Sequence, residues 1–355
     1  MEGERGPSER GRAERGRIRY PVEAAPEPGE AVEIADGILW ARLPLPMALD
    51  HVNLYALDDG DGWTVVDTGM DTTACRAAWD GLLAGPLAGR PVRRVILTHY
   101  HPDHVGLVGW LQDRGAELLT TPVTWTTARM LTLAVEERPT ETTLTYWRRA
   151  GMDPALLARR AGERPFNFAD CVAPLTHPFR RIEEGDRIEA GGRTWEVRIG
   201  NGHAASHATL WSDDGAVVLG GDQLLPSISP NIGVYASEPE ADPLREWLES
   251  CDRFLGDATE DRLVLPGHKL PYRGLPTRLV QLIENHEGAL ARLRRFLAEP
   301  RTAVEAFGTI FGHEIAASQH GFALVEAVAH MNRLWHAGEV VRTLDDDGAW
   351  RFRMA

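Results

Sequence analysis

One short segment constrains the fold of this chain more than any other part of its sequence. The apolar run RRVIL at residues 93–97 is followed, after a single threonine, by HYHPDH at residues 99–104. His99 and His101 are one residue apart, so they point to the same side of an extended backbone. The loop that follows can return Asp103 and His104 toward them. Because burying four titratable groups without an ion is costly, the segment predicts a metal site at the C-terminal end of a strand.

The spacing H-x-H-x-D-H at the end of a strand resembles the signature of the metallo-β-lactamase superfamily. Three later segments resemble further elements of that family in the same order: Gly202-His203, Gly220-Gly221-Asp222 and Pro266-Gly267-His268. The resemblance covers residues 31–273. It implies two metal ions, one held by His99, His101 and His203, the other by Asp103, His104 and His268, with Asp222 bridging the pair. Imidazole and carboxylate ligands favour two zinc ions, with iron or manganese as alternatives.

Supporting roles are predicted for three further residues. Asp67-Thr68-Gly69 matches another element of the family, and the resemblance makes Asp67 a carboxylate that orients a ligand histidine, since the free ring N–H of such a ligand needs an acceptor. The alternative for Asp67 is a simple turn former. His207 corresponds to a frequent family position that does not bind metal. His51 is interpreted as a capping or turn residue.

Two divalent ions that share a water lower its pKa enough to give a hydroxide nucleophile at neutral pH. We therefore expect a hydrolase in which this hydroxide attacks an ester, thioester or lactone carbonyl, while Asp103 orients it and passes its proton onward. One alternative is a phosphodiesterase or endoribonuclease of the same superfamily. Another is a non-catalytic metal-binding scaffold, which would predict the loss of ligands that are all present here. His101 stands where the flavodiiron branch has Glu, and this disfavours oxygen or nitric oxide reduction.

The expected fold is α/β, an αββα sandwich with a small C-terminal helical domain. Alternating β-rich runs and Gly or Asp turns begin at residue 31, so residues 1–30 are predicted to be a disordered tail and residues 31–275 the catalytic domain. A helical insertion is expected at about residues 124–163, over the site, with Trp125 and Trp147 in core packing or substrate contact. Residues 276–355 read as three helices and a small hairpin, which resembles a winged-helix-like module of one superfamily branch.

Composition narrows the possible partners. The formal net charge is −14, and residues 276–355 hold nine Lys and Arg against ten Asp and Glu, so nucleic acid is disfavoured and a small-molecule substrate is expected. No apolar run is long enough for a membrane span, and no secretory signal is recognised. Cys75, Cys171 and Cys251 lie far apart and indicate no disulfide framework, which favours the cytoplasm. A homodimer is compatible with the family's habit.

Overall fold

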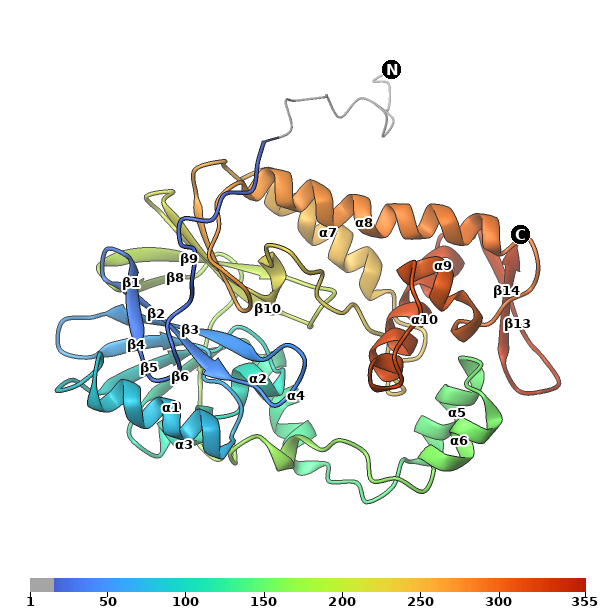
Figure 1. Cartoon of the computed structure of the whole chain (residues 1–355), viewed down its shortest axis with the longest axis horizontal. Helices are drawn as coiled ribbons and strands as arrows, with labels where there is room; N and C mark the ends of the chain where they lie inside the picture. The colour runs from blue at the N-terminus through green and yellow to red at the C-terminus, as the bar shows by residue number, and fades with distance from the viewer. Residues whose placement is uncertain (1–15) are drawn as a thin grey trace.

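The computed structural model describes residues 16–355 (Figure 1). Residues 1–15 of the predicted disordered tail lie outside the described residues. Within the part of this segment that the structure describes, the backbone of Arg19 pairs with Arg273 through hydrogen bonds of 3.1 and 2.8 Å. The Arg19 guanidinium also lies 2.9 Å from the Asp261 carboxylate. Both partners stand more than 240 positions further along the chain, so composition alone could not reveal them.

Two β-sheets form the centre of the fold, and within residues 16–355 the first has seven strands and the second has five. The first sheet contains β1 (Ala31–Ala35), β2 (Ile38–Pro44), β3 (His51–Asp58), β4 (Trp63–Val66), β5 (Val92–Ile96), β6 (Glu117–Thr120) and β7 (Arg180–Arg181), in this order. The second contains β8 (Arg187–Ala190), β9 (Arg193–Gly200), β10 (His207–Ser212), β11 (Val217–Gly221) and β12 (Leu263–Pro266). Strands β1 to β4 are antiparallel as predicted, whereas β4 to β7 and the pair β11–β12 are parallel.

Helices cover the outer face of each sheet, and this confirms the predicted αββα sandwich (Figure 1). On the first sheet and in the segment after it lie α1 (Thr73–Ala84), α2 (Pro102–Val105), α3 (Val108–Gln112), α4 (Pro122–Leu133), α5 (Glu141–Arg149) and α6 (Pro154–Arg160). The second sheet and the C-terminal region contribute α7 (Pro243–Leu255), α8 (Leu275–Phe296), α9 (Phe307–Phe311) and α10 (His320–His336). Helix α1 begins where the Thr72 side chain accepts a hydrogen bond from the Cys75 N–H at 3.1 Å.

Alternation along the strands distributes the apolar side chains over three layers. In β2, Trp40 belongs to the cluster between the two sheets, while Leu43 packs with the helices on the outer face of the first sheet. In β11, Leu219 faces the other sheet, whereas Val218 packs with α7 and α8. Because successive strand residues point to opposite faces, a sheet covered on both sides needs such continuous apolar runs.

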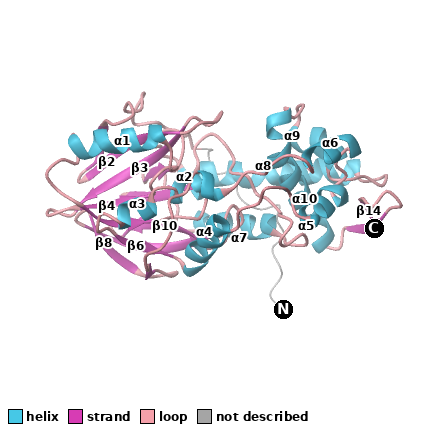
Figure 2. Ribbon diagram, turned by 90° about the horizontal axis from the view of Figure 1, so that it is seen from below, coloured by secondary structure: helices cyan, strands magenta, loops and turns pink. Residues whose placement is uncertain are grey.

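The predicted insertion and C-terminal region contact each other. Figure 2 shows α5 and α6 among the C-terminal helices, at the end of the molecule away from the two large sheets. Tyr146 of α5 is in the same buried cluster as Leu279 of α8 and Val328 of α10. The chain ends in the predicted hairpin, formed by β13 (Val340–Leu344) and β14 (Trp350–Met354).

Two further sequence predictions concern membranes and cysteines. None of the helices within residues 16–355 has both the length and the apolar composition that crossing a membrane requires. Cys75, Cys171 and Cys251 are all buried and unpaired, as predicted.

Candidate metal centre

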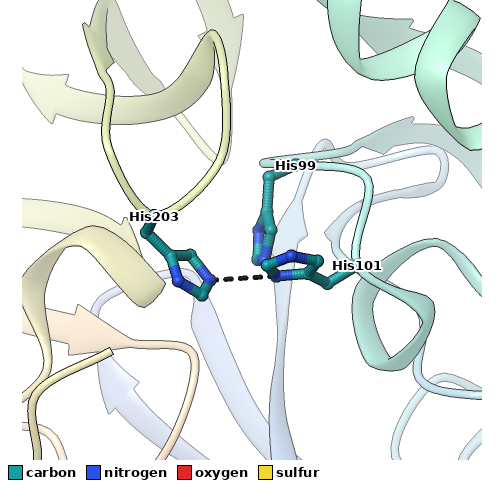
Figure 3. Close-up of side chains that lie close together, drawn as sticks. All are labelled: His99, His101 and His203. Atoms are coloured by element: carbon teal, nitrogen blue, oxygen red, sulfur yellow. Dashed lines mark hydrogen bonds between the residues drawn. The ribbon is translucent and has the colours of Figure 1, made fainter. Parts of the chain in front are cut away.

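Three predicted ligands converge from separate elements (Figure 3). His99 lies three positions after the end of β5, His101 precedes α2, and His203 lies in the loop between β9 and β10. His99 Nε2 is 3.0 Å from His101 Nδ1, which in turn is 3.0 Å from His203 Nε2. Three imidazole nitrogens at such distances form a group that can hold one cation.

A second group lies beside the first. Asp103 and His104 occupy the first turn of α2, and His268 follows β12. His268 Nε2 is 3.3 Å from Asp103 Oδ2, and His104 Nε2 is 3.6 Å from the same oxygen. These three side chains can hold another cation.

Asp222, directly after β11, lies between the two groups. Its Oδ2 is 3.6 Å from His203 Nε2 and 3.3 Å from His268 Nε2, while its Oδ1 is 3.4 Å from His104 Nε2. The parallel pairing of β11 with β12 brings Asp222 and His268 to the same sheet edge. The structure therefore brings together all seven residues that the sequence predicted as ligands.

The polar atoms of this centre fit divalent metal ions. Within residues 16–355, His104 Nε2 and Asp222 Oδ1 are buried and have no hydrogen-bond partner, although each points into the centre. Buried polar atoms without a hydrogen bond are costly unless a ligand satisfies them, and the 3.4 Å contact between these two is too long for a strong one. The position of Gly267 is equally specific, since a Cβ there would lie 2.2 Å from Asp222 Oδ1.

Each of four histidines in the centre has its other ring nitrogen beside an oxygen. His104 Nδ1 lies 2.7 Å from Asp67 Oδ2, the carboxylate that the sequence predicted for this purpose. The remaining three contacts join His99 Nδ1 to Thr98 Oγ1 at 2.9 Å, His203 Nδ1 to the Asn231 carbonyl at 2.9 Å, and His268 Nδ1 to the His51 carbonyl at 2.7 Å. Such contacts fix the ring orientation and leave the inward nitrogen for a metal.

The sequence did not predict this role for three of these partners, Thr98, Asn231 and the His51 carbonyl. Thr98 directly precedes the ligand cluster, and its hydroxyl also lies 2.9 Å from Asp67 Oδ2. Asn231 contributes a main-chain carbonyl, which any residue possesses, so its side-chain identity carries no signal for this role.

Backbone strain is concentrated around the centre. The non-glycine residues of the described chain with positive φ are Asp67 at 62°, Ser206 at 56° and Lys269 at 68°. Ser206 precedes His207 and Lys269 follows His268, so each strained residue is in the supporting structure of the site. Strain of this kind persists where surrounding contacts hold it, and it is typical of functional sites.

His207 supports the centre from outside. Its Nε2 accepts a hydrogen bond from the backbone N–H of Asp222 at 3.1 Å, and its ring stacks on His99 at a centroid distance of 4.6 Å. The Nε2 lone pair is therefore occupied in holding Asp222. His51 has a comparable structural position, because its Nε2 accepts from the Lys269 N–H at 2.9 Å.

The two tryptophans of the predicted insertion are in packing contacts. Trp125 stacks on Phe179 with ring centroids 5.0 Å apart, and Trp147 packs against the cluster around α8 and α10. Packing, the first of the two predicted roles, is therefore present for both side chains.

Electrostatics differ between the two groups of ligands. Burial lowers the pKa of His101 to about 3, so this imidazole is neutral at neutral pH. Burial also opposes a charge on His268, but Asp222 and Asp103 outweigh it and raise the pKa of His268 to about 10. For Asp103, burial raises the pKa, but His104 and His268 outweigh it and bring the pKa to about 2. In the absence of metal, the second group is therefore a cluster of ion pairs.

Comparison with known proteins identifies the family. The model of the metallo-beta-lactamase superfamily matches residues 47–268, more than half of the chain and nearly all of the site. This chain belongs to the metallo-beta-lactamase superfamily. The superfamily's "Metallo-beta-lactamase-like, C-terminal domain" matches residues 290–355. The predicted assignment to this superfamily, as a metallo-hydrolase, is confirmed.

Individual relatives in the superfamily cover most of the chain. A beta-lactamase domain protein from Burkholderia ambifaria has a solved structure with 38% identity and a TM-score of 0.86, covering 95% of this chain and 98% of its own. The "Probable metallo-hydrolase YqjP" of Bacillus subtilis is 27% identical over 290 residues, 78% of this chain and 85% of that protein. The "Acyl-coenzyme A thioesterase MBLAC2" of Gallus gallus is 26% identical over 252 residues, 66% of this chain and 78% of that protein.

Proposed function

We propose that this member of the superfamily is a dinuclear zinc hydrolase that cleaves an ester, thioester or lactone, with thioesters as the first choice. The observation that carries the proposal is the position of Asp222 between two groups of ligands, because a carboxylate shared in this way suits a pair of cations. His99, His101 and His203 would hold one ion, and Asp103, His104 and His268 the other. The similarity to an acyl-coenzyme A thioesterase supports an acyl substrate.

Different residues of the site would have different roles in hydrolysis. When bound, a pair of divalent cations supplies Lewis-acid activation of water and of the substrate carbonyl. Asp103, whose pKa is lowered to about 2, is ionised at neutral pH; its Oδ2, beside the ring nitrogens of His104 and His268, would bind the cation, and its other carboxylate oxygen can orient the attacking water by a hydrogen bond. Asp67 and the Asn231 carbonyl keep the ligand rings oriented, so little reorganisation accompanies the reaction.

A substrate panel on zinc-loaded protein tests this proposal. Acyl-coenzyme A thioesters, lactones, p-nitrophenyl esters, β-lactams and bis(p-nitrophenyl) phosphate would be compared by kcat/KM. We expect the carbonyl substrates to be hydrolysed and the phosphodiester to be left nearly intact. Efficient turnover of the phosphodiester alone would favour the phosphodiesterase alternative, and no turnover of any substrate would favour the scaffold.

The substitution Asp103→Asn tests the role of the carboxylate within the same assay. It should lower kcat by about 100-fold or more, the usual contribution of a positioned acid or base. Asp113→Asn is the matched control, because Asp113 is exposed and pairs with His177 at the surface. Equal kcat values for the two variants would remove Asp103 from the mechanism.

A further inference from the structure

A separate cluster of metal-binding side chains lies between α8 and α10. His286 belongs to α8, while Glu326 and His330 stand one helical turn apart on α10. Each offers one ligand atom, and the three atoms lie within 4.8 Å of one another. These residues lie outside the HYHPDH segment and the other motifs of the main centre.

The two imidazoles face each other inside the packed helices. His286 Nδ1 is 3.3 Å from His330 Nε2, and each residue is only 1% exposed. Their outer nitrogens have other partners, as in the main centre. His330 Nδ1 donates to the Glu326 carbonyl at 2.8 Å, which leaves a lone pair on its inward Nε2. His286 Nε2 lies 3.3 Å from Ser229 Oγ.

These contacts permit two arrangements of protons. If His286 Nε2–H donates to Ser229, both inward nitrogens carry lone pairs, which repel unless a cation binds both. If the proton is on His286 Nδ1 instead, the two rings share a direct hydrogen bond. The observed 3.3 Å is longer than the usual range of about 2.7–3.2 Å for such bonds. It matches the ~3.3 Å that separates two ligands in a tetrahedral site with metal–nitrogen bonds of about 2.05 Å.

Glu326 completes the cluster with a negative charge. Residues four apart on a helix lie on one face, so its carboxylate is on the same side of α10 as His330. Glu326 Oε2 accepts a hydrogen bond from Asn231 Nδ2 at 2.8 Å. Burial raises the pKa of Glu326 to about 7 despite this bond. Among residues 16–355, no Lys or Arg side chain forms an ion pair with the Glu326 carboxylate. A carboxylate in such surroundings is stabilised by a bound cation.

We propose that His286, Glu326 and His330 form a third cation site, which takes a divalent transition-metal ion such as Zn²⁺ between α8 and α10. Two imidazoles and one carboxylate are a common ligand set for such ions. Glu326 is partly exposed, whereas His286 and His330 are buried.

The site is connected to the main metal centre through Asn231. The side chain of Asn231 donates to Glu326, and its main-chain carbonyl receives the hydrogen bond from His203 Nδ1. A cation here therefore holds α8, α10 and the loop that orients His203 in one arrangement. Its role is structural, and it does not depend on which substrate the main centre hydrolyses.

Zinc stoichiometry of the full-length protein tests the proposal. Protein loaded with Zn²⁺ and desalted would be measured by elemental analysis, and we expect His286→Gln to hold one equivalent less than the wild type. His313→Gln is the matched control, because His313 is an exposed histidine of the same region, and it should hold as much zinc as the wild type. Equal zinc content in His286→Gln and wild type would overturn the third site.

Two further variants keep the outcome decisive. If His286→Gln fails to fold, Glu326→Gln preserves size and an acceptor for Asn231, and zinc affinity at this site should fall at least tenfold in a chelator competition. Unchanged affinity would refute the site. His101→Ala, which damages the main centre, should abolish hydrolysis yet retain the ion between α8 and α10. Zinc binding between α8 and α10 therefore tests the third site, and hydrolysis tests the proposed function, so that either proposal can be refuted without the other.

Discussion

Asp67 illustrates how single residues prepare this metal centre. Its carboxylate lies 2.7 Å from His104 Nδ1 and also accepts a hydrogen bond from the Thr98 backbone N–H at 2.9 Å. One side chain thus fixes both the orientation of a ligand ring and the backbone that leads into the ligand cluster. Asp67 itself is in the left-handed region, at φ 62°. Its cost in backbone strain is offset by these contacts.

The substitution Asp67→Asn should weaken metal binding. The amide retains an oxygen for the Thr98 N–H but loses the negative charge that supports the ring N–H of His104. Changes at such outer partners typically cost about 10–100-fold in metal affinity or activity. Competition with a chelating dye would measure the zinc affinity. Asp113→Asn removes the charge from an exposed carboxylate–histidine pair and should leave that affinity unchanged. A similar loss in both variants would assign the effect to general electrostatics.

Metal binding should release protons at neutral pH. The pKa of His268 is raised to about 10 and that of His104 is also raised, in both cases by Asp222 and Asp103 against the effect of burial. Both rings are therefore protonated on both nitrogens and positively charged at pH 7.5 in the metal-free protein. A metal ligand must instead be the neutral imidazole. A cation must displace these protons, so zinc affinity should rise with pH up to about pH 10. Titration calorimetry in buffers of different ionisation enthalpy measures the protons released. A binding enthalpy that is independent of the buffer would contradict this assignment.

At the scale of elements, the ends of strands determine where the ligands lie. His99 follows β5, Asp222 follows β11 and His268 follows β12, so the ends of three strands from two sheets meet at one edge of the sandwich. The turn after β12 also approaches Asp222 closely. Because Gly267 has no side chain, its backbone N–H can donate to the Gly221 carbonyl at 2.8 Å. Glycine is required there by the close approach of two strand ends.

Gly267→Ala should damage the site specifically. The new Cβ would lie 2.2 Å from Asp222 Oδ1 and 2.9 Å from His104 Cε1, so at least one of these side chains must move. We expect a large loss of zinc affinity and of hydrolytic activity. Gly308→Ala in α9 is the control, because nothing lies within 4 Å of its Cβ position. That change should stabilise the protein by about 0.5–1 kcal/mol, the advantage of alanine over glycine in a helix. Normal zinc affinity in Gly267→Ala would show that the turn can adjust.

Across the whole molecule, the sandwich and the C-terminal helices share one buried core. Trp211 and Val264 of the second sheet lie in the same apolar cluster as Leu279 of α8, Val328 of α10 and Phe352 of β14. The predicted boundary between residues 275 and 276 lies at the beginning of α8, and the apolar cluster contains residues from both sides of it. Separating the two parts would expose this cluster to water.

The protein should consequently unfold in one cooperative transition. Heat capacity measurements on metal-free protein should give a single peak whose calorimetric and van't Hoff enthalpies agree, because neither part can keep its core without the other. Measuring without metal avoids a separate contribution from ion release. Two resolved transitions would contradict the shared core and would indicate that the C-terminal region folds by itself.

The sequence alone determined most of the elements and which residues are predicted as ligands. Alternation in β2 and β3, the HYHPDH segment and the glycines before His203, Asp222 and His268 are local patterns, because strand period and turn geometry depend on neighbouring residues. The membership in the superfamily and the αββα fold followed from these patterns and were confirmed.

Only the tertiary structure decided which distant groups meet. The pairing of Arg19 with Arg273, and the Asn231 carbonyl beside His203, depend on main-chain atoms that every residue has, so no residue type predicts them. The packing of α5 against the C-terminal helices and the approach of His286 to His330 depend on how helices are placed after the chain has folded. Contacts between segments far apart in sequence are selected by the shape of the whole core, and a local pattern does not encode that shape.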